Sequence, residues 1–500
     1  MRHLKTIRKL SATLALTAFA LLFIRFDSFG WLNTAFHFGQ FTPAVLSALL
    51  WPAAVGASLI LLLTVLSGRL YCSFICPLGI IQDLFIKIRS LLRKKAFRPL
   101  PDFTRTHIAL AGLMIGAAAA GFMLPISLFE PFATAGRLMA GILHPIATFL
   151  FKQKSYLLGD SVGWLGLAEF RPFMWQNFVM VAGTAVFLFF LCCKWGRVYC
   201  NLACPVGAIL RLTAARSYFK IGLDPEKCVS CGLCANICKA GCIDPLEKNL
   251  DFSRCIACGN CLDACKLSGI AIQKRQKNQP EPDTSMSEGR RAFVSGIAAT
   301  AAAYLLPRTL QASPVNATAI LPPGAGDMTR FSSRCISCHL CVAACPSSII
   351  RPAQPQSGLR SLQQPSLQFD HGMCEQNCNL CSQICPVMAI EPVDANDKKL
   401  LKIGEVVYKK HLCVVETNGT DCGACAEHCP TQAVRMVPYK NNLMIPETDV
   451  SICIGCGSCE HICPVRPERA IIVKPVDKQE FIKLPEQEEL SDVGGEEFPF

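Results

Sequence analysis

Long apolar stretches alternate with polar segments over the first 200 residues, a pattern that indicates membrane-spanning helices. A bilayer requires roughly 20 apolar residues per helix. Four stretches approach or exceed this length: residues 11–24, 41–66, 107–129 and 173–193. The first is short and follows a basic start, but bulky residues stand where a signal peptide would have a small-residue cleavage site. We therefore expect it to be a span.

A shorter apolar stretch, residues 138–151, contains His144 and Pro145. Its 14 residues favour an interfacial or re-entrant segment. The loop over 67–105 carries eight lysines and arginines, and basic residues accumulate in cytoplasmic loops. We expect four spans in a prokaryotic inner membrane, with both ends of the bundle in the cytoplasm.

The chain becomes polar and cysteine-rich from about residue 221. The expected fold class is a multidomain membrane protein, an α-helical transmembrane bundle with α+β ferredoxin-like [4Fe–4S] domains. The expected divisions are a transmembrane domain (1–220), a cytoplasmic two-cluster domain (221–275), a linker (276–289), a signal or anchor segment (290–307), a second linker (308–330), a four-cluster domain that we expect to be periplasmic (331–475) and an acidic tail (476–500).

Composition agrees with a membrane location. The hydrophobic fraction is 51% and the charged fraction 17%, which is too apolar for an ordinary soluble domain. A net charge of +12 is compatible with nucleic-acid binding. The basic residues gather beside hydrophobic segments, however, so we interpret them as orientation signals and expect lipid, not nucleic acid, as a partner.

The chain has 31 cysteines, and 24 of them form six runs of four. Disulfide frameworks occur in short secreted chains, and zinc sites normally pair two two-ligand knuckles. Cysteines at i, i+3 and i+6 with a fourth after three more residues are typical of [4Fe–4S] clusters. The sequence therefore predicts six such clusters.

The first two runs form a pair: Cys228, Cys231, Cys234 and Cys238, then Cys255, Cys258, Cys261 and Cys265. In two-cluster ferredoxins the fourth cysteine of a run ligates the other cluster. We therefore assign Cys265 to the first cluster and Cys238 to the second.

Four later runs all end in C-x2-C-x3-C-P, and only the first gap varies. They are Cys335, Cys338, Cys341 and Cys345; Cys374, Cys378, Cys381 and Cys385; Cys413, Cys422, Cys425 and Cys429; and Cys453, Cys456, Cys459 and Cys463. Exchange of the fourth cysteine between adjacent runs satisfies this spacing, and so does nested exchange of the first with the fourth run and the second with the third.

A second kind of motif is duplicated within the apolar part. The segment from Gly68 to Gly79, with Cys72-x3-Cys76-Pro, recurs 128 residues later with Cys200-x3-Cys204-Pro. Cysteines at i and i+4 share one helix face. If the copies meet, the four thiols could hold a shared iron centre or form a redox-active thiol site. The alternative is that they are packing cysteines in an apolar core.

Arg290 and Arg291 precede an alanine-rich apolar stretch. Two arginines before a hydrophobic helix can simply mark its cytoplasmic end, or they can form a twin-arginine export signal for a folded, cofactor-loaded domain. A third possibility is that the segment, with only about 15 apolar residues, never inserts. Cleavage of the segment also stays open.

Other side chains capable of metal binding fit no motif. We interpret the cysteines outside the motifs as structural; they are Cys192, Cys193 and Cys242. The histidines beside apolar stretches could contact a quinone or a haem, but a lone histidine is more often structural; they are His37, His107 and His144.

Residues 1–270, with duplicated C-x3-C-P motifs and a paired cluster module, resemble the NapH family of membrane ferredoxins. Residues 287–475 resemble the NapG and MauM families. The chain departs from these patterns at Gly289, where the export signal usually has serine, and at Lys239 and Lys266, where proline commonly follows the fourth cysteine. The resemblance implies a NapH–NapG fusion that transfers electrons from membrane quinol toward a periplasmic reductase.

We thus expect an electron conduit between the quinone pool, or a cytoplasmic donor, and a periplasmic or membrane oxidoreductase. No nucleophile or acid–base pair is recognisable in the sequence, so quinol is the one substrate that the protein would transform as part of a respiratory chain. The alternative is a maturation or regulatory factor that reduces metal centres during assembly of a metalloenzyme.

Overall fold

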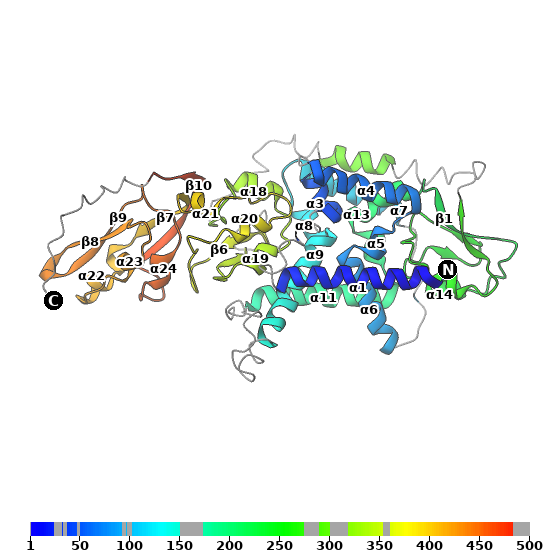
Figure 1. Ribbon diagram of the computed structural model, residues 1–500, viewed down its shortest axis with the longest axis horizontal. Helices are drawn as coiled ribbons and strands as arrows, with labels where there is room; N and C mark the ends of the chain where they lie inside the picture. The colour runs from blue at the N-terminus through cyan, green and yellow to red at the C-terminus, as the bar shows by residue number, and fades with distance from the viewer. Residues whose placement is uncertain are drawn as a thin grey trace, which may run out of the picture.

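The computed structural model describes residues 2–24, 33, 38–47, 51–92, 97, 103–150, 174–274, 290–300, 319–353 and 361–483. These residues form an elongated molecule of three parts in line (Figure 1). A helical bundle occupies the centre, the domain with the first two cysteine runs lies at one end, and the four later runs extend toward the other. The expected linker 276–289, residues 301–318, His37 and the acidic tail beyond 483 lie outside the described residues.

The central bundle consists of helices from the apolar part of the chain. They are α1 (Arg2–Ile24), α3 (Phe41–Leu46), α4 (Trp51–Ser67), α5 (Tyr71–Phe74), α6 (Pro77–Leu92), α7 (Thr104–Ala119), α8 (Leu124–Phe129), α9 (Pro131–Leu138), the π-helix η1 (Met139–Leu143), α11 (Trp175–Trp195), α12 (Val198–Leu202) and α13 (Pro205–Ala214).

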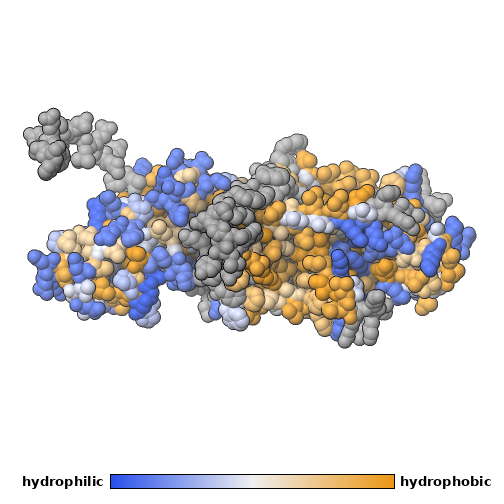
Figure 2. Space-filling model, turned by 60° about the horizontal axis from the view of Figure 1, so that its bottom comes forward, coloured by the Kyte–Doolittle hydropathy of each residue, from blue (hydrophilic) through white to orange (hydrophobic). Residues whose placement is uncertain are grey.

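The outer surface of this bundle is apolar. Leu62 on α4 is 54% exposed, and Val186 on α11 is 68% exposed. Figure 2 shows hydrophobic residues gathered over the bundle and hydrophilic ones over the C-terminal part. Exposed aliphatic side chains over such an area indicate a surface that contacts lipid or another apolar partner.

Two of the described helices are long and apolar enough to cross a membrane, Lys5–Ile24 and Trp175–Trp195. The expected spans over 41–66 and 107–129 are not continuous helices. The former comprises α3 and α4, and the latter comprises α7 and α8. Hydropathy detected their apolar character but not these breaks; Gly121, with a φ of +82°, lies between α7 and α8.

The helical stretch 290–300 begins at Arg290 and packs closely on α7. A Cβ on Gly112 would lie 2.5 Å from the carbonyl oxygen of Phe293, and one on Gly296 would lie 2.7 Å from that of Ala109. Small residues that let two backbones approach are typical of helix pairs in membranes. The segment that contains the two arginines therefore lies against the bundle.

The domain with the first two runs has a ferredoxin-like arrangement. β1 (Phe219–Leu223) pairs antiparallel with β4 (Ile270–Lys274), and a short hairpin joins β2 (Ile243–Asp244) to β3 (Asn249–Leu250). Short helices α14 (Leu233–Ile237) and α15 (Asn260–Ala264) follow the cysteine loops. Since Tyr218 N donates to Val65 O at 2.8 Å, the first strand starts directly at the end of α4.

The C-terminal part holds the four later runs on short helices and paired strands. The helices are α18 (Met328–Arg334), α19 (Leu340–Ala344), α20 (Leu380–Ile384), α21 (Ala395–Lys398), η5 (Lys410–Leu412), α22 (Val414–Asn418), α23 (Ala424–Glu427), η6 (Lys440–Asn442) and α24 (Ser458–Ile462). The antiparallel pairs are β5 (Ile350–Pro352) with β6 (Pro365–Leu367), β7 (Leu401–Tyr408) with β10 (Ile471–Phe481), and β8 (Val434–Pro438) with β9 (Met444–Thr448).

This part is longer at both ends than expected. β10 continues beyond residue 475 to Phe481. Ile320, which lies in the expected linker 308–330, forms a bridge with Leu367. The boundaries differ because strand pairing can recruit residues on either side of the cysteine runs.

Candidate metal centres

Four of the six ferredoxin-type runs share one loop conformation. In each of these runs, the residues two and four positions after the first cysteine have positive φ angles. They are Ser230 and Gly232, Ala257 and Gly259, Ser337 and His339, and Gly455 and Gly457. Since few non-glycine residues adopt positive φ, the recurrence indicates a loop that must curl three cysteines around one centre. The runs from Cys374 and Cys413 have a longer first gap and lack this pair of angles.

Backbone amides in these loops point at cysteine sulfurs. The amide of Ala257 donates to Cys255 Sγ at 3.3 Å, and that of Gly269 donates to Cys265 Sγ at 3.2 Å. Such donors stabilise the negative charge of a cluster and tune its potential. Within the described part of the chain, no group of three or more His, Cys, Asp or Glu side chains converges on a site for a single metal ion. The residues fit [4Fe–4S] clusters.

Burial explains why these sites depend on bound iron. Burial raises the pKa of the Cys341 thiol well above its ordinary value, and the neighbouring Cys338 and Cys335 raise it further. A buried group of thiols therefore resists ionisation unless a cation compensates the charge. Iron supplies that charge when bound, so metal binding and folding of these loops are coupled.

The structure distinguishes between the two pairings of the later runs. Cys385 lies within electrostatic range of Cys335, Cys338 and Cys341, and Cys345 within range of Cys374, Cys378 and Cys381. Cys429 lies near Cys453, Cys456 and Cys459, and Cys463 near Cys425. Fourth cysteines are therefore exchanged between adjacent runs. In the first domain, Cys238 likewise lies near Cys258 and Cys261.

The two C-x3-C-P copies face each other in the bundle. Cys72, Cys76, Cys200 and Cys204 are all buried, and Cys204 lies within electrostatic range of the other three. We refer to them as the four-thiol site. All 31 cysteines of the chain are free, so no disulfide joins them.

Two arginines connect the copies in a reciprocal way. Arg69 of the first copy donates to Cys200 O at 3.0 Å, and Arg197 of the second copy donates to Cys72 O at 2.6 Å. A Cβ on Gly79 would collide with Cys72 O, and one on Gly207 with Cys200 O. The repeated glycines thus allow close approach of the chain, and the repeated arginines hold the two cysteine turns together.

These arginines are also fully buried, at 0% exposure each. Arg197 pairs with Asp83, at 2.8 Å between Arg197 Nη2 and a carboxylate oxygen. Within the described residues, Arg69 forms no ion pair with a carboxylate; it also donates to Asn201 Oδ1 at 2.7 Å and contacts the Cys72 side chain. An uncompensated buried cation is costly, so an anionic group at the four-thiol site would fit this environment.

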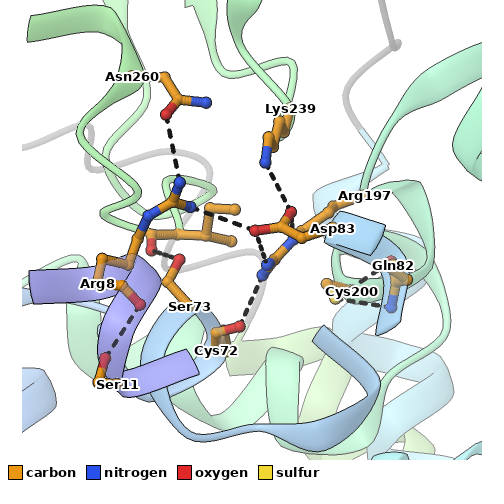
Figure 3. A network of polar contacts seen from close by, with 11 residues as sticks. Arg8, Ser11, Cys72, Ser73, Gln82, Asp83, Arg197, Cys200, Lys239 and Asn260 are labelled. Carbon is orange, nitrogen blue, oxygen red and sulfur yellow. Dashed lines mark hydrogen bonds and ion pairs between the residues drawn. The ribbon is translucent and has the colours of Figure 1, made fainter. Parts of the chain in front are cut away.

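Asp83 lies at the centre of a network between the bundle and the first ferredoxin domain (Figure 3). Its carboxylate pairs with Arg197, with Lys239 at 2.9 Å and with Arg8 at 3.2 Å. Sequence reasoning missed Asp83 because it lies four residues beyond the repeated segment that ends at Gly79. The second copy has Arg211 at the corresponding position, so the carboxylate is specific to the first copy.

At the opposite end of the bundle, α9 contacts the first of the later runs directly. A Cβ on Gly136 would collide with the carbonyl oxygen of Cys338. The neighbouring Arg137 donates to Ser127 O at 2.7 Å and reaches Ser337 O at 3.5 Å. The cluster loop is therefore seated on the bundle.

The residues without a motif occupy varied positions. Cys192 is buried near Cys200, and Cys242 Sγ lies 3.6 Å from Cys238 Sγ, beside a cluster site. His107 is buried with its Nε2 2.9 Å from Cys204 O, which is a structural contact. His144 lines a cavity described below.

Comparison with known proteins identifies the same sites. A family model described as a 4Fe-4S binding domain matches residues 49–97 and 176–223, which contain the two C-x3-C-P copies. Two further 4Fe-4S binding domain models match residues 221–244 and 252–268. A 4Fe-4S dicluster domain model matches residues 334–389 and 420–466, in agreement with adjacent pairing of the later runs.

Individual relatives are ferredoxin-type proteins. The chain is 33% identical over 193 residues, which are 37% of its length and 84% of the relative's, to the methylamine utilization ferredoxin-type protein MauM of Methylophilus methylotrophus. The chain belongs to the MauM family of ferredoxin-type proteins. It is also 29% identical over 206 residues, 38% of this chain and 86% of the relative, to the ferredoxin-type protein NapG of Escherichia coli. No solved structure matches.

Membership of the MauM family accounts for less than half of the chain. It confirms that the protein is an iron–sulfur electron-transfer protein of the NapG/MauM type with several [4Fe–4S] sites. The two long apolar helices are weak support for association with a membrane.

Proposed function

We propose that this protein is a membrane-bound conduit that takes electrons from quinol and passes them along a line of [4Fe–4S] sites to a partner oxidoreductase. One observation carries the proposal, namely that adjacent pairing places the later cysteine runs in a continuous series leading away from the bundle. A maturation factor would need to reach a metal centre, but it would not need such a series.

The series starts on the bundle. The Cys338 loop lies on α9 and belongs to the site that Cys385 completes. The second site follows within the same module, because α19 and α20 are packed together.

The two modules of the C-terminal part also meet at cysteines. Cys374 N donates to Cys456 O at 2.8 Å, so the second site adjoins the one that contains Cys453, Cys456 and Cys459. The site with Cys413, Cys422 and Cys425 lies farthest along the molecule (Figure 1). Its partly exposed Cys422 and Cys425 suit an exit toward a partner.

The proposal includes the membrane arrangement expected from the sequence. The NapH-like part spans the inner membrane with four helical segments, and the stretch that begins at Arg290 stays as a fifth, anchoring segment. Close packing of this stretch on α7 through Gly112 and Gly296 supports an anchor over a cleaved signal. The first ferredoxin domain then lies in the cytoplasm and the four-cluster domain in the periplasm.

The proposal also assigns an iron centre to the four-thiol site. The cysteines would hold it, and Arg69 and Arg197 would compensate its negative charge. Such a centre would supply one-electron chemistry. The two arginines orient the two copies. The two arginines and the four cysteines exclude water, since all six of these side chains are buried.

The decisive experiment is anaerobic reduction of the purified full-length chain by a short-tailed quinol. Visible absorbance and electron paramagnetic resonance would follow the clusters, and iron analysis would count them. We expect about 24 irons for six clusters, plus those of the four-thiol site. Quinol should reduce the clusters at a rate that matches partner turnover. If a fully loaded protein stays oxidised, and deletion of its gene removes metal from the partner enzyme, the maturation role is correct and the conduit is refuted.

A further inference from the structure

A cavity of about 350 Å³ lies between the bundle and the first of the later cysteine runs. Its walls come from the helical stretch 140–150, the start of α11, and a segment of the C-terminal part between Val342 and Arg351. Part of the first wall is the π-helix η1 (Met139–Leu143). π-helical turns are rare and occur frequently at functional sites.

Two buried polar atoms at this cavity have no hydrogen-bond partner, Asn177 Oδ1 on α11 and Arg351 Nη2 on β5. A buried polar group left unsatisfied costs about 1–3 kcal/mol, and native proteins contain few of them. Asn177 Oδ1 accepts a hydrogen bond and Arg351 Nη2 donates one. Together they are complementary to a ligand that carries oxygen atoms with both hydrogen-bonding roles.

The remainder of the lining is mostly apolar, with His144, Thr148 and Ser348 as its other polar residues. Ile146, Phe149 and Leu150 are each more than half exposed, at 51%, 58% and 60%, and they continue the lipophilic surface of the bundle into the cavity wall. A ligand from the lipid phase could therefore enter without crossing a polar barrier. The occupant should combine an apolar body with a few oxygen atoms.

The cavity also borders a cluster site. Val342, which lines it, directly follows Cys341, and Ser348 lies three residues after Cys345. Any molecule in the cavity lies against the loop of the run that is seated on α9. This position connects the cavity to the start of the series of sites.

We propose that this cavity binds the ring of a quinol, with Arg351 donating to one ring oxygen and Asn177 accepting from a ring hydroxyl. The assignment rests on the proposed function and adds the place where the donor binds. A ring with its first side-chain carbons suits the cavity volume, while a longer tail would extend along the exposed apolar residues.

The test is anaerobic equilibrium binding of a radiolabelled short-tailed quinol to the iron-loaded full-length chain in detergent, with the clusters reduced beforehand so that the quinol is not oxidised. Arg351→Met retains most of the apolar stem but removes the charged donor, and should weaken binding about tenfold or more. Asn177→Leu should weaken it about threefold to tenfold. Arg351→Lys should restore part of the affinity. Arg435→Met, an exposed arginine on β8 outside the cavity, is the control and should bind as wild type does.

An alkylbenzene of the same tail length distinguishes quinol binding from lipid-tail binding. It should compete poorly, because it lacks the ring oxygens; equal competition would overturn the assignment. Unchanged binding in both the Arg351 and Asn177 variants would overturn it as well. Since these residues lie on different elements, misfolding of one variant, detected by iron loss, leaves the other to decide.

The outcome separates the two proposals. If quinol reduces the wild-type clusters but binding is insensitive to both substitutions, the assignment of the quinol site to this cavity is wrong and the conduit stands. If the substitutions abolish saturable binding but quinol never reduces the clusters, the binding site stands and the conduit is refuted.

Discussion

Replacing Asp83 by asparagine should loosen the contact between the bundle and the first ferredoxin domain. The carboxylate neutralises cations from three separate segments, Arg8 on α1, Arg197 after α11 and Lys239 beside a cluster cysteine (Figure 3). The distances are between 2.8 and 3.2 Å. The Asp83→Asn substitution keeps the volume and removes the charge, so three cations remain without their shared partner.

The magnitude follows from the environment of Asp83. Burial opposes ionisation, but attraction to Arg197 and Lys239 dominates and lowers its pKa from 3.8 to about 2. This difference corresponds to about 2.5 kcal/mol of stabilisation. Breaking a buried pair costs roughly 3–5 kcal/mol, and the 21% exposure of the carboxylate favours the lower end. We therefore expect a loss of about 3 kcal/mol.

The direction in which the stabilisation by Asp83 changes with pH also follows from its pKa. Because the folded pKa of Asp83 is below its unfolded value, its stabilising effect is complete above about pH 4 and is lost as the pH falls toward 2. At neutral pH the full difference between wild type and Asp83→Asn should be present. Thermal loss of cluster absorbance, together with limited proteolysis of the first ferredoxin domain, measures it.

Asp263→Asn is the matched control. Asp263 also joins the ferredoxin domain to α1, through Lys5 at 3.1 Å, but the two side chains are 28% and 37% exposed. An exposed pair contributes only about 0–1 kcal/mol. If both variants lose stability to the same extent, the buried network around Asp83 does not hold the domains together and the reasoning fails.

Three shorter predictions concern other contacts. Gly136→Val should slow delivery of electrons to the four-cluster domain, because its side chain would collide with a carbonyl of the first later run. Gly183→Val is the control and should leave the rate unchanged, because nothing lies within 4 Å of a Cβ there. The kinetics of cluster reduction compare the two variants. Gly112→Leu should release the stretch 290–300 from α7, costing about 1–3 kcal/mol and increasing protease cleavage there. Arg69→Met should lower the iron content by roughly the two to four irons of one centre, while electron paramagnetic resonance shows the six ferredoxin-type sites intact.

Local features could be predicted from the sequence, and features that depend on distant contacts could not. Spacing within a run defines a cluster loop, and the structure shows the same loop angles around Ser230 and Ser337. The exchange partner of Cys345 could not be predicted, because adjacent and nested pairing use the same ligands. Only the tertiary position of Cys345, beside Cys374 and Cys381, distinguishes them.

In the bundle, too, local features were predictable and distant contacts were not. Hydropathy located the apolar stretches, but it carries no information on helix continuity, so the break near Gly121 was missed. The internal repeat predicted that the two cysteine pairs could meet. It could not predict the crossed bonds from Arg69 and Arg197, because each arginine bonds to a cysteine carbonyl of the other copy.

These crossed arginines bear on the three interpretations of the four-thiol site. Packing cysteines are neutral and would leave Arg69 buried at 0% exposure with Asn201 Oδ1, a carbonyl and the Cys72 thiol as neutral partners. Thiolates that ligate iron carry negative charge and would compensate that cation directly. Because an uncompensated buried charge is far more costly than a lost packing contact, the buried charge of Arg69 favours an anionic site, such as the iron centre, over neutral packing cysteines.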